Sequence, residues 1–178
     1  MADDRRHWLT INRAPVLTLW AAVVAERLGF DRDEALTLGR AVAGLNAYAK
    51  GKSLGLFSPT PEDVGKKRKE LREREGLSVD LLQRAVPATR TRDGLRALSK
   101  DKPIKPESVQ RYLESKFGDA LEDAADAMRT LARSVDREDL ARLGFGFYER
   151  FRPEIPSGTK GWGAKGRLDL DRIRALAK

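Results

Sequence analysis

Apolar residues recur along most of this chain at the three- and four-residue intervals of amphipathic helices. The clearest run begins at Pro15, whose missing N–H suits a first helical turn, and reaches Leu28. Gly29 follows, and glycine readily adopts the left-handed conformation that ends a helix. Almost every side of this helix is apolar, so we expect it to be buried against several neighbours.

A second helix is predicted directly after the first, because Asp31 and Glu34 have the spacing of a capping box. Gly39 and Gly44 each cost a helix about 1 kcal/mol relative to alanine, so we expect another backbone to lie close to both. Gly51 is expected to end the helix. Its apolar stripe is Ala35, Leu38, Val42, Leu45 and Ala49. The two helices are predicted to form a hairpin.

The rest of the chain is also predicted to be mainly helical. Further helices are expected over residues 61–75, 78–86, 106–117, 120–132, 137–151 and 170–176. Residues 87–106 fit either a mobile basic segment or a short strand pair that turns at Asp93-Gly94. The expected fold is therefore mainly α, with about seven to nine helices built on the N-terminal hairpin.

We expect one helical domain over 1–178, with an optional subdivision into 1–58, 59–105 and 106–178. The chain has 178 residues, 40% hydrophobic and 35% charged, which is enough to bury a core. It has no cysteine, so disulfides and thiolate metal sites are excluded. Its longest apolar stretch is too short and too polar to span a bilayer, and its start does not have the order of a signal peptide. A cytoplasmic protein that does not enter membranes is expected.

The net charge of +8 is concentrated in the middle of the sequence. Residues 1–50 carry seven Lys/Arg against six Asp/Glu, and residues 119–178 carry twelve against eleven. Residues 51–118 carry sixteen against ten, a net +6. An excess of this kind is typical of a surface that attracts polyanions.

Two segments of this middle third are especially basic. Residues 66–74 hold six cations and two acids, and residues 84–105 hold seven cations and two acids. Cations spaced along a helix can neutralise phosphates, although pairs such as Lys66–Glu70 are also typical of a solvated helix face. The candidate phosphate contacts here are Lys66, Lys67, Lys69, Arg72, Arg90 and Arg92.

Residues 157–167 form a predicted loop with four glycines, three cations, one tryptophan and no acid. Glycines let a backbone approach a phosphate, the helix expected to follow attracts anions, and an aromatic ring can stack on a base. The pattern matches neither GxxxxGK[ST] nor GxGxxG after a strand. The alternative is a glycine-shaped turn with Trp162 packed in the core. Candidate binding residues are Lys160, Trp162, Lys165 and Arg167.

Catalysis finds little support in the sequence. The single histidine, His7, lies near one end with no partner at a diagnostic spacing. The acids of 122–126 fit the polar face of a helix, and Asp169 and Asp171 fit a helix cap and a first-turn acid. We therefore expect no enzyme activity, no cofactor and no metal site.

The favoured function is a non-catalytic nucleic-acid-associated protein, provided that the basic segments meet in one patch. One alternative is a protein-interaction or oligomerisation module, because the first helix is apolar around its circumference and a second copy could cover it. Another is a binder of an anionic small molecule at the 157–167 loop.

Overall fold

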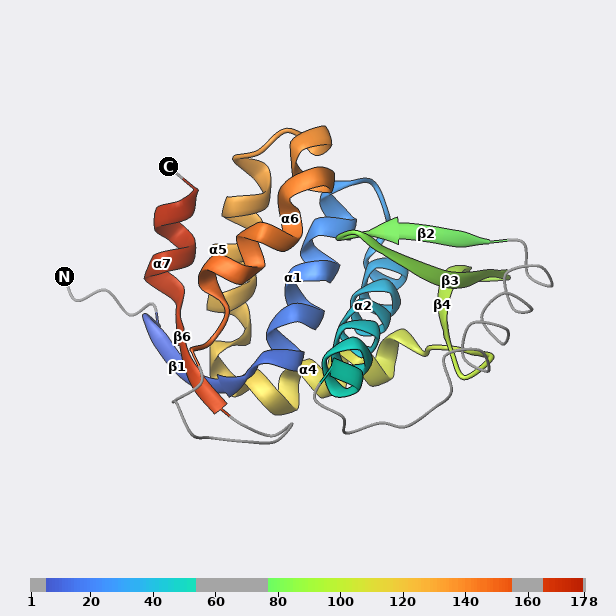
Figure 1. Cartoon of the computed structure of the whole chain (residues 1–178), viewed down its shortest axis with the longest axis horizontal. Helices are drawn as coiled ribbons and strands as arrows, with labels where there is room; N and C mark the ends of the chain where they lie inside the picture. Colours follow the sequence, from blue (N-terminus) through green and yellow to red (C-terminus); the bar gives the residue numbers. More distant parts are fainter. Residues whose placement is uncertain (1–5, 54–76, 155–164, 178) are drawn as a thin grey trace.

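The computed structural model describes residues 6–53, 77–154 and 165–177, which form an α+β fold around a central helix (Figure 1). The helices are α1 Arg13–Arg27, α2 Arg32–Ser53, α4 Pro106–Phe117, α5 Leu121–Arg133, α6 Arg137–Phe151 and α7 Leu170–Leu176, with a 3-10 turn at Gly118–Ala120. The strands are β1 Trp8–Asn12, β2 Ser78–Leu81, β3 Arg84–Thr91, β4 Gly94–Ser99, β5 Lys102–Pro103 and β6 Lys165–Asp169. The prediction of a mainly α fold is wrong, because the strands form two antiparallel sheets.

The helix α1 lies at the centre of the molecule, and every residue from Pro15 to Ala25 is buried. Helices α2, α4, α5 and α6 contact it from different sides. Trp20 is fully buried, its Nε1 donates to the carbonyl oxygen of Gly144 at 2.9 Å, and its ring meets that of Phe151 edge-on at 5.3 Å. The predicted all-round burial of α1 is confirmed, and the chain itself provides the cover.

The predicted hairpin of α1 and α2 is confirmed. Gly29 has a φ of 117°, which the left-handed end of α1 requires. At the start of α2 the Asp31 N–H donates to Glu34 Oε1 at 3.1 Å, and the Glu34 N–H donates to Asp31 Oδ1 at 2.8 Å. The capping box therefore forms as expected, and α2 ends at Ser53, two residues beyond Gly51.

Gly39 and Gly44 of α2 behave differently. A Cβ on Gly39 would meet the carbonyl oxygen of Thr18 and would lie 2.9 Å from the nitrogen of Ala22. The expected close approach is therefore confirmed at this position, where α2 packs on the backbone of α1. A Cβ on Gly44 would meet nothing within 4 Å, so the same expectation is wrong there.

Residues 78–86 are not helical, contrary to prediction, but form β2 and the start of β3. The two strands pair antiparallel, with Val79 opposite Val86. The turn between them places Leu82 and Gln83 at φ values of 50° and 64°, the left-handed pair typical of tight hairpins. Leu82 is buried and lies so close to Gly144 of α6 that a Cβ there would be 2.5 Å from its Cδ2. The turn contains neither glycine nor asparagine, so the packing of Leu82 against α6 accounts for this hairpin.

The strand pair that turns at Asp93-Gly94 is confirmed, and β2-β3-β4-β5 form one sheet in sequence order. The strand β5 pairs with only the last two residues of β4. Along the rest of this edge, the Leu95 N–H donates to Glu34 Oε2 at 2.9 Å and the Ala97 N–H donates to Thr37 Oγ1 at 3.1 Å. Side chains of α2 thus complete the β4 edge of the sheet.

The second sheet joins the two ends of the described chain, because β1 pairs antiparallel with β6. The predicted loop therefore ends in a strand from Lys165, not directly at a helix. Gly166 lies against the backbone of Glu154, where a Cβ would meet the carbonyl oxygen. Asp169 then accepts hydrogen bonds from the N–H groups of Asp171 and Arg172 at 3.0 and 3.3 Å, which confirms its predicted role as the cap of α7.

The helices predicted after residue 105 are confirmed as α4, α5, α6 and α7. Gly118 ends α4 with a φ of 56°. Asp136 directly precedes α6, but its side chain forms no capping hydrogen bond. Across the parts of the chain that the structure describes, no helix is both long and apolar enough to cross a membrane.

Candidate nucleic-acid interface

Of the ten binding residues predicted from the sequence, the structure describes four. Four of them, Arg90, Arg92, Lys165 and Arg167, are described, while Lys66, Lys67, Lys69, Arg72, Lys160 and Trp162 lie outside the described residues. Arg90 and Arg92 belong to β3 and its turn, and Lys165 and Arg167 belong to β6. Figure 1 shows these two sheets at opposite ends of the molecule, with α1 between them. The structure therefore does not bring the two described pairs into one patch.

Arg90 and Arg92 are both exposed, at the turn that joins β3 to β4. The Thr91 hydroxyl donates to the Gly94 carbonyl oxygen at 2.8 Å and accepts from the Asp93 N–H at 3.2 Å. These bonds hold the backbone of the turn. Neither guanidinium forms an ion pair with a carboxylate of the described ranges.

Further exposed Lys and Arg residues follow Arg92 in the sequence. The exposed cations, here called the basic region, are Arg90, Arg92, Lys100, Lys102, Lys105, Arg111 and Lys116. They come from β3, the turns flanking β4, β5 and α4. Residues 77–118 carry nine Lys/Arg against five Asp/Glu, a net +4. Among the described residues, the nearest approach to an ion pair by this segment is Arg96 to Asp33, at a long 4.0 Å, and Arg96 is buried.

Helix α2 adds one oriented cation next to this region. The Arg40 guanidinium lies 4.6 Å from the centre of the Tyr112 ring of α4, a cation–π contact that links the two helices. Burial raises the pKa of the Tyr112 phenol, although the charge of Arg40 acts in the opposite direction. The ring therefore remains neutral at physiological pH while it supports the exposed Arg40.

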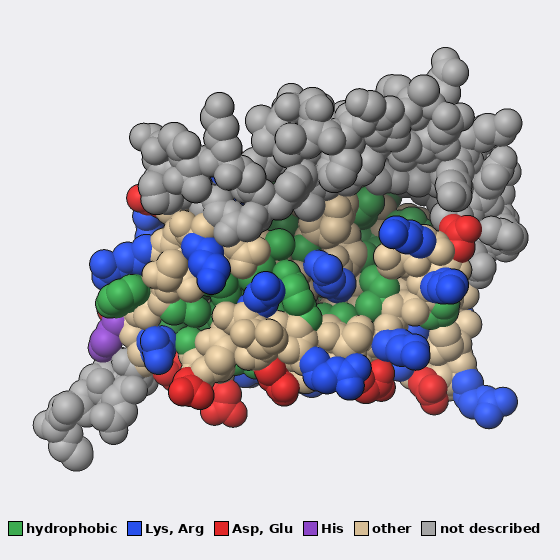
Figure 2. Space-filling model, turned by 90° about the horizontal axis from the view of Figure 1, so that it is seen from below, with side chains coloured by type: hydrophobic (Ala, Val, Ile, Leu, Met, Phe, Trp, Pro, Cys, Tyr) green, Lys and Arg blue, Asp and Glu red, His purple; other side chains and the backbone are tan. Residues whose placement is uncertain are grey.

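Figure 2 shows the molecule from below, the side on which α4 lies in Figure 1. Lys and Arg side chains are spread across the middle of the described surface, with apolar side chains between them. Most Asp and Glu side chains lie along one edge. In the middle of this view no acidic side chain lies between the cations, whereas acids and cations alternate along the lower edge.

The C-terminal part of the molecule has the opposite character. Its described residues from 119 onward carry ten Lys/Arg against eleven Asp/Glu, a net −1. Four arginines lie 2.7–3.5 Å from carboxylate oxygens: Arg129, Arg142, Arg172 and Arg174. Arg167 instead lies over the half-exposed ring of Trp8, 4.6 Å from its centre, and Lys165 is exposed.

His7 is exposed and tied to α7. Its Nδ1 lies 2.8 Å from Asp171 Oδ2, while Arg174 Nη1 donates to Asp171 Oδ1 at 2.7 Å. The hydrogen bond from Arg174, and then the one from His7, lower the pKa of the Asp171 carboxyl. The sequence alone did not pair these residues. His7 and Asp171 lie at the surface and Arg174 is partly buried, and the arrangement joins the N-terminal segment to α7.

Two of the three acids of α5 are occupied by structural contacts. Asp123 Oδ2 accepts from the Arg6 N–H at 2.9 Å, and Asp126 pairs with Arg129. Within the described ranges, no group of three or more His, Asp or Glu side chains is arranged to hold a metal ion.

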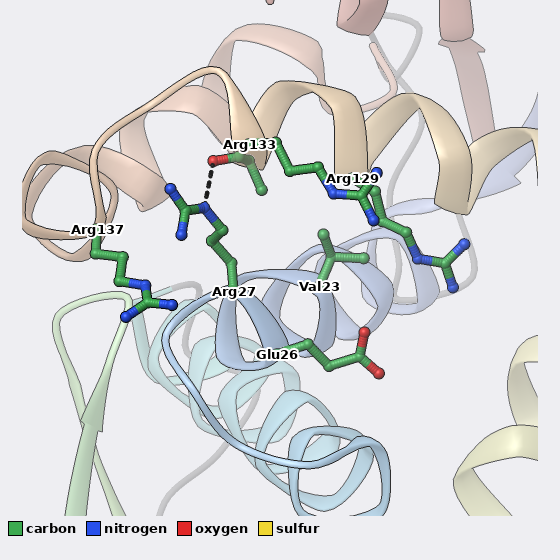
Figure 3. A pocket seen from close by; sticks show the side chains of 7 residues that line it. Val23, Glu26, Arg27, Arg129, Arg133 and Arg137 are labelled. Carbon is green, nitrogen blue, oxygen red and sulfur yellow. Dashed lines mark hydrogen bonds between the residues drawn. The ribbon is translucent and has the colours of Figure 1, made fainter.

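One concentration of charge was not found from the sequence. Arg27, Arg129, Arg133 and Arg137 line a hollow between α1, α5 and α6 (Figure 3). The last three recur every four residues, in a third of the chain whose other residues carry nine Lys/Arg against eleven Asp/Glu. This spacing is a signal that the sequence does contain.

Comparison with protein-family models, curated proteins and solved structures finds no match to this chain.

Proposed function

We propose that this protein binds nucleic acid, without acting on it chemically, through the basic region. The observation that carries this proposal is the contrast in charge pairing. The cations of the basic region lie exposed without close carboxylates from the described residues, whereas four arginines of the C-terminal part are matched by acids. Unmatched cations are free to neutralise phosphates, and the counterions that this releases favour binding.

Strand β4 separates two cations of the basic region by its own length. Arg92 precedes β4 and Lys100 follows it, so the six-residue strand separates them. A strand of this length spans about 17–20 Å. The cations can therefore reach several phosphates along a backbone rather than one. Contacts of this type position a protein on nucleic acid without reading its sequence.

A salt titration tests the proposal directly. Fluorescence anisotropy with labelled duplex and single-stranded DNA and RNA is measured at several salt concentrations. Affinity is expected to fall as salt rises, and each phosphate contact adds about 0.7–0.9 to the slope of log K against log salt. The variant Arg90→Gln/Arg92→Gln is expected to reduce this slope by up to about 2.

The matched control is Arg142→Gln/Arg172→Gln, which removes the same charge from exposed arginines that already have acidic partners. Its slope is expected to equal that of the wild type. The proposal fails if the wild type does not bind any of the four nucleic acids at low salt. It also fails if both variants lose slope equally, because net charge alone would then explain the binding.

A further inference from the structure

The arginine hollow lies away from the basic region, where the ends of α1 and α5 meet the start of α6. It has a volume of about 400 Å³ and is lined by Val23, Glu26, Arg27, Arg129, Ala132, Arg133 and Arg137. In Figure 3, Arg27 and Arg137 lie on one side of Val23, and Arg129 and Arg133 lie on the other. Four arginines from three helices thus line this space, together with the apolar side chains of Val23 and Ala132.

The charges around this hollow are not balanced. Its lining has four cations and one acid, a net +3. Glu26 is engaged by Arg32 at 3.5 Å, and Arg129 by Asp126 at 3.0 Å. The side chains of Arg133 and Arg137 form no hydrogen bond or ion pair with any described residue. Like charges held near one another repel, so an anion in the hollow would be stabilised.

Arg27 is held in place at the edge of the hollow. Its Nε donates to the Ala132 carbonyl oxygen at 3.4 Å, and its Nη2 donates to the Val135 carbonyl oxygen at 3.3 Å. Guanidinium carries five N–H donors, so several remain for a ligand. Because the protein already fixes this side chain, binding would cost it little conformational freedom.

Helix electrostatics does not explain the whole cluster. Arg133 lies in the last turn of α5, where a positive charge interacts favourably with the helix dipole. Arg137 lies in the first turn of α6, where the same interaction is unfavourable. A role for Arg137 as a ligand donor accounts for a charge that the helix itself does not favour.

We propose that this hollow binds the phosphate groups of a small phosphorylated compound. A phosphate presents oxygens in a tetrahedral arrangement and accepts bonds from guanidinium groups that approach from different helices. A carboxylate has two oxygens in one plane and a single charge, and it would leave most of the +3 unmatched. The volume lies within the range of small-molecule sites, about 300–1,000 Å³.

Isothermal titration calorimetry with pyrophosphate tests this site. The test variant is Arg133→Gln/Arg137→Gln, and the matched control is Arg142→Gln/Arg150→Gln, which removes the same charge from exposed positions of α6. Wild type and control are expected to bind pyrophosphate saturably. The test variant is expected to bind at least about tenfold more weakly, which corresponds to about 1.4 kcal/mol. Circular dichroism confirms that the variants are folded.

Two results would overturn the proposal: pyrophosphate binding that is absent, or that is equal in test variant and wild type. Citrate binding as tight as pyrophosphate binding would overturn the assignment to phosphate. The test variant is also titrated with the labelled oligonucleotides. An unchanged salt slope identifies a free phosphorylated compound as the ligand, and a reduced slope identifies nucleic-acid backbone as the source of the phosphate. The hollow does not depend on the basic region, so either proposal can fail alone.

Discussion

The two sheets of this protein carry the same kind of candidate residue but are built in different ways. The four-stranded sheet is a local meander, and its Arg90 and Arg92 lie exposed without carboxylate partners among the described residues. The two-stranded sheet joins segments more than 150 residues apart, and its Arg167 lies on Trp8. Two basic strands in one sequence therefore present their charge differently.

This difference shows that the spatial neighbours of a cation, more than its place in a basic run of the sequence, decide whether its charge is paired within the protein. Around the four-stranded sheet, α2 supplies hydrogen bonds to the β4 edge, and the cations at its turns face outward. Around the two-stranded sheet, Arg172 pairs with Glu154 and Arg174 pairs with Asp171. Charge there joins segments of the chain to one another.

The largest expected effect is a loss of stability caused by a substitution in the two-stranded sheet. Gly166→Ala introduces a Cβ that collides with the Glu154 carbonyl oxygen, and such overpacking costs about 1–3 kcal/mol of unfolding free energy. Gly146→Ala is the control, because a Cβ there meets nothing within 4 Å and alanine favours the helix by up to about 1 kcal/mol. Urea denaturation followed by circular dichroism measures both. Equal stability of the two variants would contradict the close approach at Gly166.

The next effect tests how α2 completes the four-stranded sheet. Thr37→Val keeps the shape of the side chain but removes the acceptor for the buried Ala97 N–H, which is expected to cost about 1–3 kcal/mol. Thr130→Val removes a hydroxyl from an exposed position and is expected to change stability by less than about 0.5 kcal/mol. The urea midpoints compare the two. An unchanged midpoint for Thr37→Val would show that the β4 edge does not need this bond.

A smaller effect compares the cations of the two sheets. Arg90→Gln/Arg92→Gln is expected to lower the salt slope of oligonucleotide binding more than Lys165→Gln/Arg167→Gln, because Arg167 is held on Trp8. Each lost phosphate contact lowers the slope by about 0.7–0.9. Parallel anisotropy titrations at matched protein concentration measure the difference. A larger loss in the second variant would move the interface to the two-stranded sheet.

The smallest expected effect concerns pH. The pKa of Asp171 is lowered in the folded protein by Arg174 and His7, so the unfolded chain takes up its proton more readily. The stability from this carboxylate is complete above its ordinary pKa of 3.8 and is lost as pH falls below it. Asp171→Asn is expected to flatten the fall in urea midpoint below about pH 4. Asp119→Asn is the control, and equal flattening in both variants would exclude the specific contact.

Much of the helical structure was predictable because its signals are local. The capping box of Asp31 and Glu34, the left-handed Gly29 and the cap at Asp169 act within a few residues of themselves. The sheets were mostly missed. The turn at Leu82 and Gln83 has no glycine or asparagine to announce it, and β1 and β6 pair across almost the whole chain. Non-local pairing of this kind has no local period that marks it.

The candidate sites show the same division. The amino-acid sequence by itself determined how much positive charge the chain has, which third of it is richest, and that α1 would be buried on all sides. Only the tertiary structure decided which cations have acidic neighbours, that two basic strands lie at opposite ends, and that Arg27 lines one hollow with three arginines distant in the sequence. The physical reason is range: helix caps and periodicity act within a few residues, while charge pairing depends on which segments packing brings together.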